Sequence, residues 1–477
     1  MLKTIIKKEI QNNIFSFRFL TSLVMLLVIV TVTVFILTSD YLNKIDEYSQ
    51  RQTEIGNYMK SYAHFNRIGA ILEPSQPPIP FYSLIRGLSS DVNIGEFDDD
   101  PLPVMFPLID LVFIVTILMS LIALIFSYDS VSGEKEDGTL KLMLSNDFSR
   151  SKVILGKIAG GVLTLFIPFV VSLIVGVLLI TLEPRVAWSG ADWGALGLVV
   201  IGAVLYFGFF YGLGMFISSR HQASSSSIMT SLFVWVLLIL VIPNLSPYVA
   251  SFISPTPSRI KIDRETSRIT DTERDDLARK LRSERLRELV KKYPVLVQAE
   301  GLSEAKIKER VAKDPAFREA YQARTREVQA AIDEVNRIQG EKADKIWREF
   351  GRKEAAQTEL SRYLSMVSPL SDFTFLATDL SSTGTRNQVH FGQVSSLFWQ
   401  AFRDYMQQRV AALQKKDPST DWYNTPVDMS DMPRFQYKEE ALSGRVKSTM
   451  PAFALLIIYS VILFLAAYFS FIRYDVR

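Results

Sequence analysis

Long apolar runs separated by polar segments dominate the pattern of this chain. Each run is close to the 20 residues that a helix needs to cross the hydrocarbon core of a bilayer, about 30 Å thick. Backbone amides inside a bilayer must bond internally, so each run is predicted to be a helix. The six predicted spans cover residues 19–38, 104–126, 153–182, 194–217, 227–247 and 450–472. The first is too long for a signal peptide and no small-x-small cleavage site follows it, so it is predicted to be a retained span.

Positive charge in the short flanks predicts the orientation of the spans. With both termini in the cytoplasm, most flanking lysines and arginines lie inside. These are Lys3, Lys7, Lys8, Arg18, Lys135, Lys141, Arg150, Lys152, Lys157, Arg220, Arg473 and Arg477. The outer flanks are poorer in positive charge, with Asp40, Asp98–Asp100, Glu183, Arg185 and Asp192. Two outer segments are long: a loop at 39–103 and a domain at 248–449, and long outer domains do not follow the charge rule.

The outer domain is predicted to be mainly helical, with a long antiparallel hairpin. Thr270 and Glu273 form a possible capping box before an apolar stripe that ends at Pro294. A second helix is expected from Pro315 to about Leu364. Its seam repeats every seven residues, through Tyr321, Val328 and Val335, with Ala331 and Ile338 beside it. A further aromatic helix around residues 391–405 is expected to pack against the base of the hairpin.

Composition excludes several classes of function. Lys and Arg total 53 against 50 Asp and Glu, so a nucleic-acid partner is not indicated. Cysteine is absent and the three histidines are far apart, which leaves no disulfide framework and no metal motif. No nucleophile or paired-carboxylate motif is visible, so no catalytic residue is predicted. The chain also contains no G-x-x-x-x-G-K-[ST] sequence, and therefore no ATP site of its own.

The connector after the second span, residues 128–152, carries the most informative pattern. Glu134, Glu136 and Asp137 precede a predicted short helix from Thr139 to Ser145, where a helix dipole favours negative charge. The apolar side of that helix would be formed by Leu140, Met143 and Leu144. These side chains need either a protein partner or the lipid headgroups, and the pattern alone does not separate the two.

The connector resembles the signature of type-2 ABC exporter permeases. The residues that carry the resemblance are Ser132-Gly-Glu-Lys-Glu-Asp-Gly-Thr-Leu140, Leu142-x-Leu144, Ser149-Arg150 and Gly156-Lys157. In that family this segment includes the coupling helix, which seats in a groove of a separate ATPase. The resemblance implies that Glu134, Glu136, Gly138, Thr139, Leu140, Leu142, Met143, Leu144 and Arg150 face the ATPase. It also implies a bacterial cytoplasmic membrane location, two ATPase copies that bind ATP and Mg, and a second permease, identical or homologous.

The N-terminal residues and the long insertion between the fifth and sixth spans add two further expectations. Residues 1–18 form an amphipathic helix with basic anchors that is expected to lie at the lipid interface and, by the resemblance, to touch the ATPase. Family members have a short re-entrant hairpin where this chain carries residues 248–449, and a subset with a large insertion is similar to it. Two functions follow: an ATP-driven exporter, or a mechanotransmitter that acts on an envelope partner through 248–449 and transports no solute.

Inside the spans, Asp110 is an intramembrane ionisable residue and hence a functional candidate, although snorkelling or a bond to a neighbouring helix is favoured. The pairs Gly156/Gly160 and Gly208/Gly212 have the spacing of close helix packing, expected within one subunit. Residues 206–211 make the fourth span unusually aromatic, which suggests either an amphipathic path or, preferably, bulk that faces lipid.

Overall fold

The computed structural model describes residues 2–60, 63–87, 109–140, 149–299, 303–417, 420–422 and 424–473. Over these ranges the fold is helical, and the only strand-type pairing is one antiparallel bridge between Ala63 and Val427. Six of the described helices are long and apolar enough to cross a membrane. This confirms the prediction of an all-α membrane protein with six spanning helices. Compact packing divides the chain into one unit of residues 1–243 and 366–477 and another of residues 244–365.

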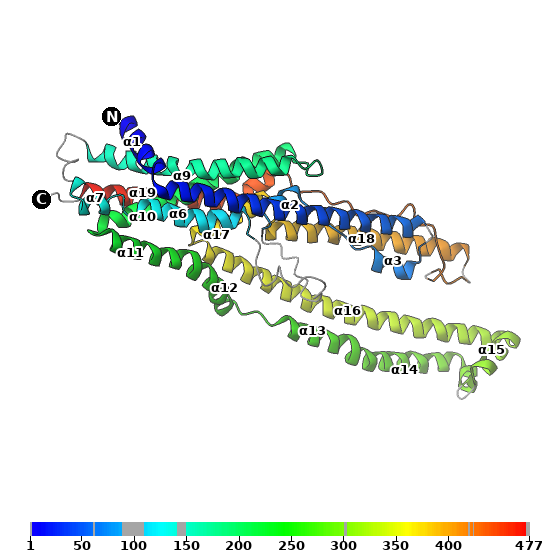
Figure 1. Cartoon of the computed structure of the whole chain (residues 1–477). Coiled ribbons are helices and arrows are strands. Elements are labelled where there is room, and N and C mark those ends of the chain that lie inside the picture. Colours follow the sequence, from blue (N-terminus) through cyan, green and yellow to red (C-terminus); the bar gives the residue numbers. More distant parts are fainter. Residues whose placement is uncertain are drawn as a thin grey trace. The chain divides into compact units, whose positions relative to one another are not determined.

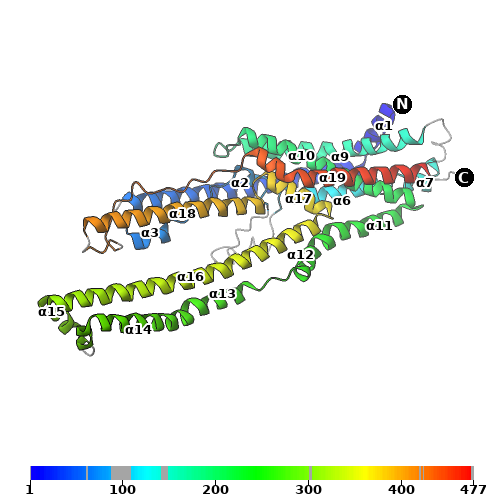
Figure 2. The ribbon, with the colours of Figure 1, turned by 180° about the vertical axis from the view of Figure 1, so that it is seen from behind.

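The spans belong almost wholly to the first unit (Figures 1 and 2). The second and the fifth include a π-helical turn, η2 and η3. The six spans are α2 (Phe17–Lys60), α5–η2–α6 (Leu111–Phe113, Ile114–Met119, Ser120–Ser127), α9 (Arg150–Thr181), α10 (Gly190–Arg220), α11–η3–α12 (Ser224–Val236, Leu237–Val241, Ile242–Ile253) and α19 (Leu442–Ile472). A short helix α1 (Leu2–Ile14) precedes them, and it lies at the same end of the unit as the last turn of α19 (Figure 1).

The central helix of this unit is α10, which packs against α6, α9, α17 and α19. The aromatic residues Tyr206, Phe207, Phe210 and Tyr211 are fully buried, so the expectation that they face lipid is wrong. Tyr206 also donates a hydrogen bond to the carbonyl of Thr116, 2.8 Å away. The aromatic part of α10 is therefore surrounded by protein rather than lipid, whereas Ile201 earlier in the same helix is 54% exposed.

The first span differs most from its prediction. Helix α2 continues unbroken to Lys60, through residues that were expected to form a loop (Figure 1). Its polar extension keeps an apolar stripe, because Leu42 and Ile45 pack on the main core and Ile55 and Met59 on a second one. The rest of the predicted 39–103 segment contains α3 (Phe65–Ile71) and the 3-10 turn η1 (Pro80–Ser83), while 61–62 and 88–103 lie outside the described residues.

The predicted outer domain 248–449 is divided in the structure. Helices α17 (Pro369–Leu380) and α18 (Thr385–Lys416) belong to the first unit with the spans. The aromatic helix α18 packs its Phe398 and Phe402 against Met59, Phe65 and Ile68. Both views show α18 beside the distal half of α2 (Figures 1 and 2). The apolar residues of α18 therefore pack against residues 55–72 within the first unit, and packing against the hairpin base stays a prediction.

The second unit contains the expected hairpin. Its two arms are α13–η4–α14 (Arg259–Ser267, Arg268–Glu273, Arg274–Lys292) and α16 (Pro315–Ser365), joined by η5 (Pro294–Ala299) and α15 (Glu304–Lys313). Ala331 and Val335 of the predicted seam are buried, and Arg285 bridges the arms to Glu327 and Glu334. The proposed capping box is wrong. Thr270 lies within the continuous first arm, and its hydroxyl donates to the carbonyl of Thr266.

Candidate functional site: the connector after the second span

The connector forms a five-residue helix, α7 (Ser132–Glu136), directly after the second span. Its start is held by Ser218 near the end of α10. The Ser218 hydroxyl oxygen accepts the backbone N–H groups of Val131 and Ser132 at 3.1 and 2.9 Å. Ser227 in α11 in turn donates to the carbonyl of Tyr128 at 2.7 Å. The connector is thereby bonded to both helices that flank the turn between the fourth and fifth spans.

Charged side chains of α7 complement the helix ends at this turn. The last carbonyls of a helix lack intrahelical partners and carry partial negative charge. The Lys135 ammonium group donates to two such carbonyls, those of Ser219 at 2.7 Å and His221 at 3.0 Å. At the positive start of α11, the Ser224 hydroxyl donates to the Glu136 carboxylate at 2.6 Å. A movement of α7 therefore requires a movement of the α10–α11 turn or the loss of these bonds.

A buried ion cluster connects α7 with two further helices. The Lys157 ammonium group of α9 lies 2.8 Å from the Glu134 carboxylate of α7 and 3.7 Å from the Glu9 carboxylate of α1. The Lys157 side chain is 7% exposed, against 27% for Glu134 and 17% for Glu9. A lysine so far from water needs an opposite charge beside it, because an isolated buried ammonium group is very costly. The cluster therefore fixes the relative positions of α1, α7 and α9.

Helix α1 reaches this cluster because two glycines of α9 leave room for it. A Cβ atom at Gly156 would lie 2.5 Å from the Ile5 Cγ2 atom, and one at Gly160 would lie 2.8 Å from the Glu9 Cβ atom. Both distances are shorter than van der Waals contact allows. The Gly156/Gly160 pair thus packs helices closely within the chain, as predicted. Gly208 has open space around its Cβ position and makes no such contact.

Two arginines join the connector region to the first and last spans. Arg18, at the start of α2, pairs with Asp129 at 2.8 Å and donates to the Tyr128 hydroxyl at 3.1 Å. Arg150, at the start of α9, donates to the Ile472 carbonyl at the end of α19, 2.7 Å away. Arg150 thus bonds a helix end inside this chain.

The remaining predicted connector residues divide by exposure. Glu136, Gly138 and Thr139 are exposed, and Gly138 adopts a φ of +69° that glycine tolerates best. Leu140 is instead 1% exposed and belongs to the core of the first unit. Its burial anchors this end of the connector to the core of the first unit. Leu142, Met143 and Leu144, with most of the predicted helix 139–145, lie outside the described residues.

Asp110 has a structural position at the start of the second span. The described helix begins at Leu111 with Asp110 as its N-cap, and residues 104–108 of the predicted span lie outside the described residues. One carboxylate oxygen accepts the Phe113 N–H at 2.8 Å, and the other accepts the Gly87 N–H at 3.4 Å. A carboxylate at a helix N-terminus satisfies orphan donors and complements the dipole. No cluster of three His, Cys, Asp or Glu side chains suited to a metal occurs among the described residues.

Lys157 belongs to the motif after the second span, but the motif does not indicate its partners Glu9 and Glu134. A lysine within an apolar run was the available signal, since such a residue needs a buried carboxylate. Ser218 and Lys135 carried no local signal, because their partners lie far away in the chain.

Together, the six spanning helices and a connector bonded to the ends of several of them define a multi-pass helical membrane protein with an internal connecting element. The chain belongs to the ABC-2 family of transporter proteins, whose family model matches residues 3–476. Two relatives, each described as probable ABC transporter permease protein NosY, come from Stutzerimonas stutzeri and Pseudomonas aeruginosa. They are 33% identical over 128 and 129 residues, or 27% of this chain. The aligned regions cover 46% of the length of each relative.

Proposed function

We propose that this chain is the permease subunit of an ATP-driven ABC exporter, coupled to a separate ATPase through residues 133–150. One observation carries the proposal: α7 is bonded to α9, α10 and α11, and through Lys157 it is linked to Glu9 of α1, while Glu136, Gly138 and Thr139 remain exposed. An exposed segment whose inner side is bonded to several spans is suited to transmit a movement of a bound ATPase to those spans. Family membership supports the same role.

The proposed assembly has two permeases and two ATPases, and the ATPases bind ATP and Mg. The second permease is identical or homologous, since closed two-fold assemblies are the commonest oligomers. Both termini and the connector are assigned to the cytoplasm of a bacterial cell and the membrane to its cytoplasmic membrane, because positive charge gathers in those flanks. In this arrangement ATP binding closes the ATPase pair, the connector moves, and the spans open a path.

Cysteine crosslinking in the native membrane tests the coupling role directly. The chain has no natural cysteine, so a single introduced one is the only site of reaction. Thr139→Cys is expected to crosslink to a P-loop ATPase with a short bifunctional reagent. Thr181→Cys is the matched control, because Thr181 is also exposed but lies at the opposite end of α9. Failure of Thr139→Cys to capture any ATPase, with the complex intact, would refute the coupling role.

A second candidate is a mechanotransmitter, in which ATP hydrolysis drives the hairpin unit to act on an envelope partner. The observation in its favour is that residues 244–365 form a compact unit of their own, with arms clamped by Arg285. The two functions are separated by measuring what stimulates the ATPase. A soluble or lipid cargo would stimulate an exporter, whereas a partner captured by the hairpin would stimulate a mechanotransmitter.

A further inference from the structure

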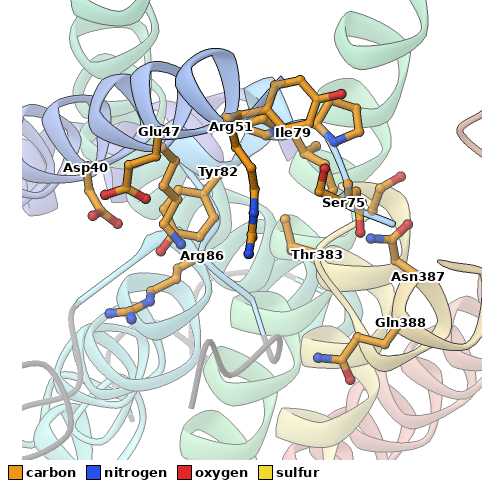
Figure 3. Close-up of a pocket in the computed structure, with 16 residues that line it drawn as sticks. Asp40, Glu47, Arg51, Ser75, Ile79, Tyr82, Arg86, Thr383, Asn387 and Gln388 are labelled. Carbon is orange, nitrogen blue, oxygen red and sulfur yellow. The ribbon is translucent and has the colours of Figure 1, made fainter. Parts of the chain in front are cut away.

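A polar cavity of about 720 Å³ lies in the first unit, beside the part of α2 that follows the predicted first span (Figure 3). One wall is the extension of α2, the second is the segment 75–86, and the third is the turn before α18 together with its first residues. Polar side chains line it, among them Lys44, Arg51, Tyr82, Arg86, Thr383 and Asn387. A volume of this size is typical of small-ligand sites.

Hydrogen-bond donors dominate the lining. Arg51 extends from α2 between Tyr82 and Thr383 (Figure 3). Its ion pair with Glu73, 2.8 Å long, leaves both side chains more than half exposed. Such a pair contributes little, and the guanidinium group has five N–H donors to offer. Arg86 lines the same cavity, and the Lys44 ammonium group lies 4.4 Å from the centre of the Tyr82 ring.

Two buried polar groups in the wall add donors. The Tyr82 side chain is 7% exposed, and its hydroxyl lies near the Asp40 carboxylate but forms no hydrogen bond of good geometry among the described residues. The Gln76 amide nitrogen is also buried and makes no hydrogen bond among the described residues. Burial is the main cause that raises the pKa of Tyr82 to about 12, so this hydroxyl stays protonated at neutral pH. A buried donor without a partner costs free energy, which a bound acceptor would recover.

The cavity walls are held in place independently of any ligand. Gly87 has a φ of +77°, and a Cβ atom there would overlap Thr383, so only glycine lets the two segments touch. Asp110 accepts the Gly87 N–H, and the buried Arg445 donates to the Ser382 hydroxyl at 2.9 Å. A preformed site loses less entropy on binding than one that must be ordered by its ligand.

We propose that this cavity binds an anionic, oxygen-rich group, namely a phosphate or carboxylate carried by a small molecule or by a lipid headgroup. Lys44, Arg51 and Arg86 outnumber the carboxylates of Asp40 and Glu47, and the neutral side chains add amide and hydroxyl donors. The carboxylates lie on the α2 side, away from Asn387 and Gln388 (Figure 3). The anion therefore lies between Arg51, Thr383 and Asn387. The site does not depend on coupling to an ATPase, so its failure and the failure of the proposed function are separate results.

Binding is tested on the purified full chain in a maltoside detergent, which contributes no phosphorus. Broadening of the ³¹P resonance of inorganic phosphate measures the binding of a soluble anion. Native mass spectrometry with added phosphatidylglycerol measures the binding of a lipid headgroup. Arg51→Gln is expected to weaken binding about tenfold, since a charge-assisted bond is lost. Glu47→Gln removes a repulsion and is expected to strengthen it about threefold. Arg67→Gln is the matched control, because Arg67 is exposed and does not line the cavity.

The pattern of outcomes decides both the proposal and the source of the anion. If Arg51→Gln weakens and Glu47→Gln strengthens the binding of phosphate alone, the ligand is a soluble anion. If they do so for the binding of phosphatidylglycerol alone, the ligand is a lipid headgroup. The proposal is overturned if neither variant differs from the Arg67→Gln control in the binding of phosphate or of phosphatidylglycerol. Should Arg51→Gln lower the yield of folded protein, Glu47→Gln still tests the charge dependence, because its predicted effect is a gain.

Discussion

The buried cluster of Lys157, Glu9 and Glu134 gives the sharpest prediction for the connector. Changing both glutamates to glutamine leaves the Lys157 ammonium group, only 7% exposed, without an opposite charge. Removing the partner of a buried charge costs about 3–5 kcal/mol. Because the glutamates are 17% and 27% exposed, water offsets part of this loss, and about 3 kcal/mol is expected. Glu134→Gln alone should account for most of it, since Glu134 makes the 2.8 Å contact.

The decisive variant adds Lys157→Met to the two glutamine substitutions. A buried ion pair replaced as a whole by uncharged residues of similar volume is often neutral or stabilising. The triple variant should therefore recover most of the stability that the double variant loses. The assay is the midpoint of thermal unfolding in one detergent at one scan rate, with the exposed Glu54→Gln as control. If the triple variant is no more stable than the double one, the cluster does not hold α1, α7 and α9 together as argued.

Three further predictions concern neighbouring residues. Thr139→Cys should react rapidly with a water-soluble maleimide and Leu140→Cys slowly, because one side chain is exposed and the other is 1% exposed; equal rates would contradict the burial of Leu140. Gly156→Ala combined with Gly160→Ala should displace α1 and increase proteolysis near the N-terminus, whereas Gly208→Ala, which meets no neighbour, should not. Asp110→Ala should destabilise the chain by about 1–2 kcal/mol through loss of the N-cap, while Asp110→Asn, which keeps an acceptor, should cost less in the same thermal assay.

The sequence was sufficient for features that repeat along the chain. Apolar runs of span length predicted six crossing helices, and the seven-residue seam through Val328 and Val335 predicted the hairpin, because both follow from helix geometry alone. The position of the connector followed from a motif rather than from a repeat. Its internal contacts did not follow, since Glu9 and Lys157 lie far apart in the chain and meet only through the Gly156/Gly160 packing.

The errors have physical causes as well. Hydropathy windows locate the bilayer and give no signal for a helix that continues beyond it, so they predict a loop where the polar half of α2 continues. Asp110 was placed inside a span because the apolar run begins near residue 104. Pro107 lies just upstream, and aspartate is a preferred N-cap, so helix-start rules pointed to the observed boundary. The depth assigned to Asp110 rested on composition alone, and capping chemistry describes its position better.

Helix α2 gives the connector and the polar cavity a common element. Arg18 at its start is paired with Asp129 beside α7, and Arg51 on the same unbroken helix extends into the cavity. At 1.5 Å per residue, about 50 Å of helix separates these two arginines. An α-helix of this length transmits axial displacement and rotation with little internal change, because its backbone bonds are satisfied within the helix. If the Arg18–Asp129 pair is kept and α2 moves as a rigid helix, a displacement of the connector would shift Arg51 against Thr383 and Asn387, where the anion is proposed to bind.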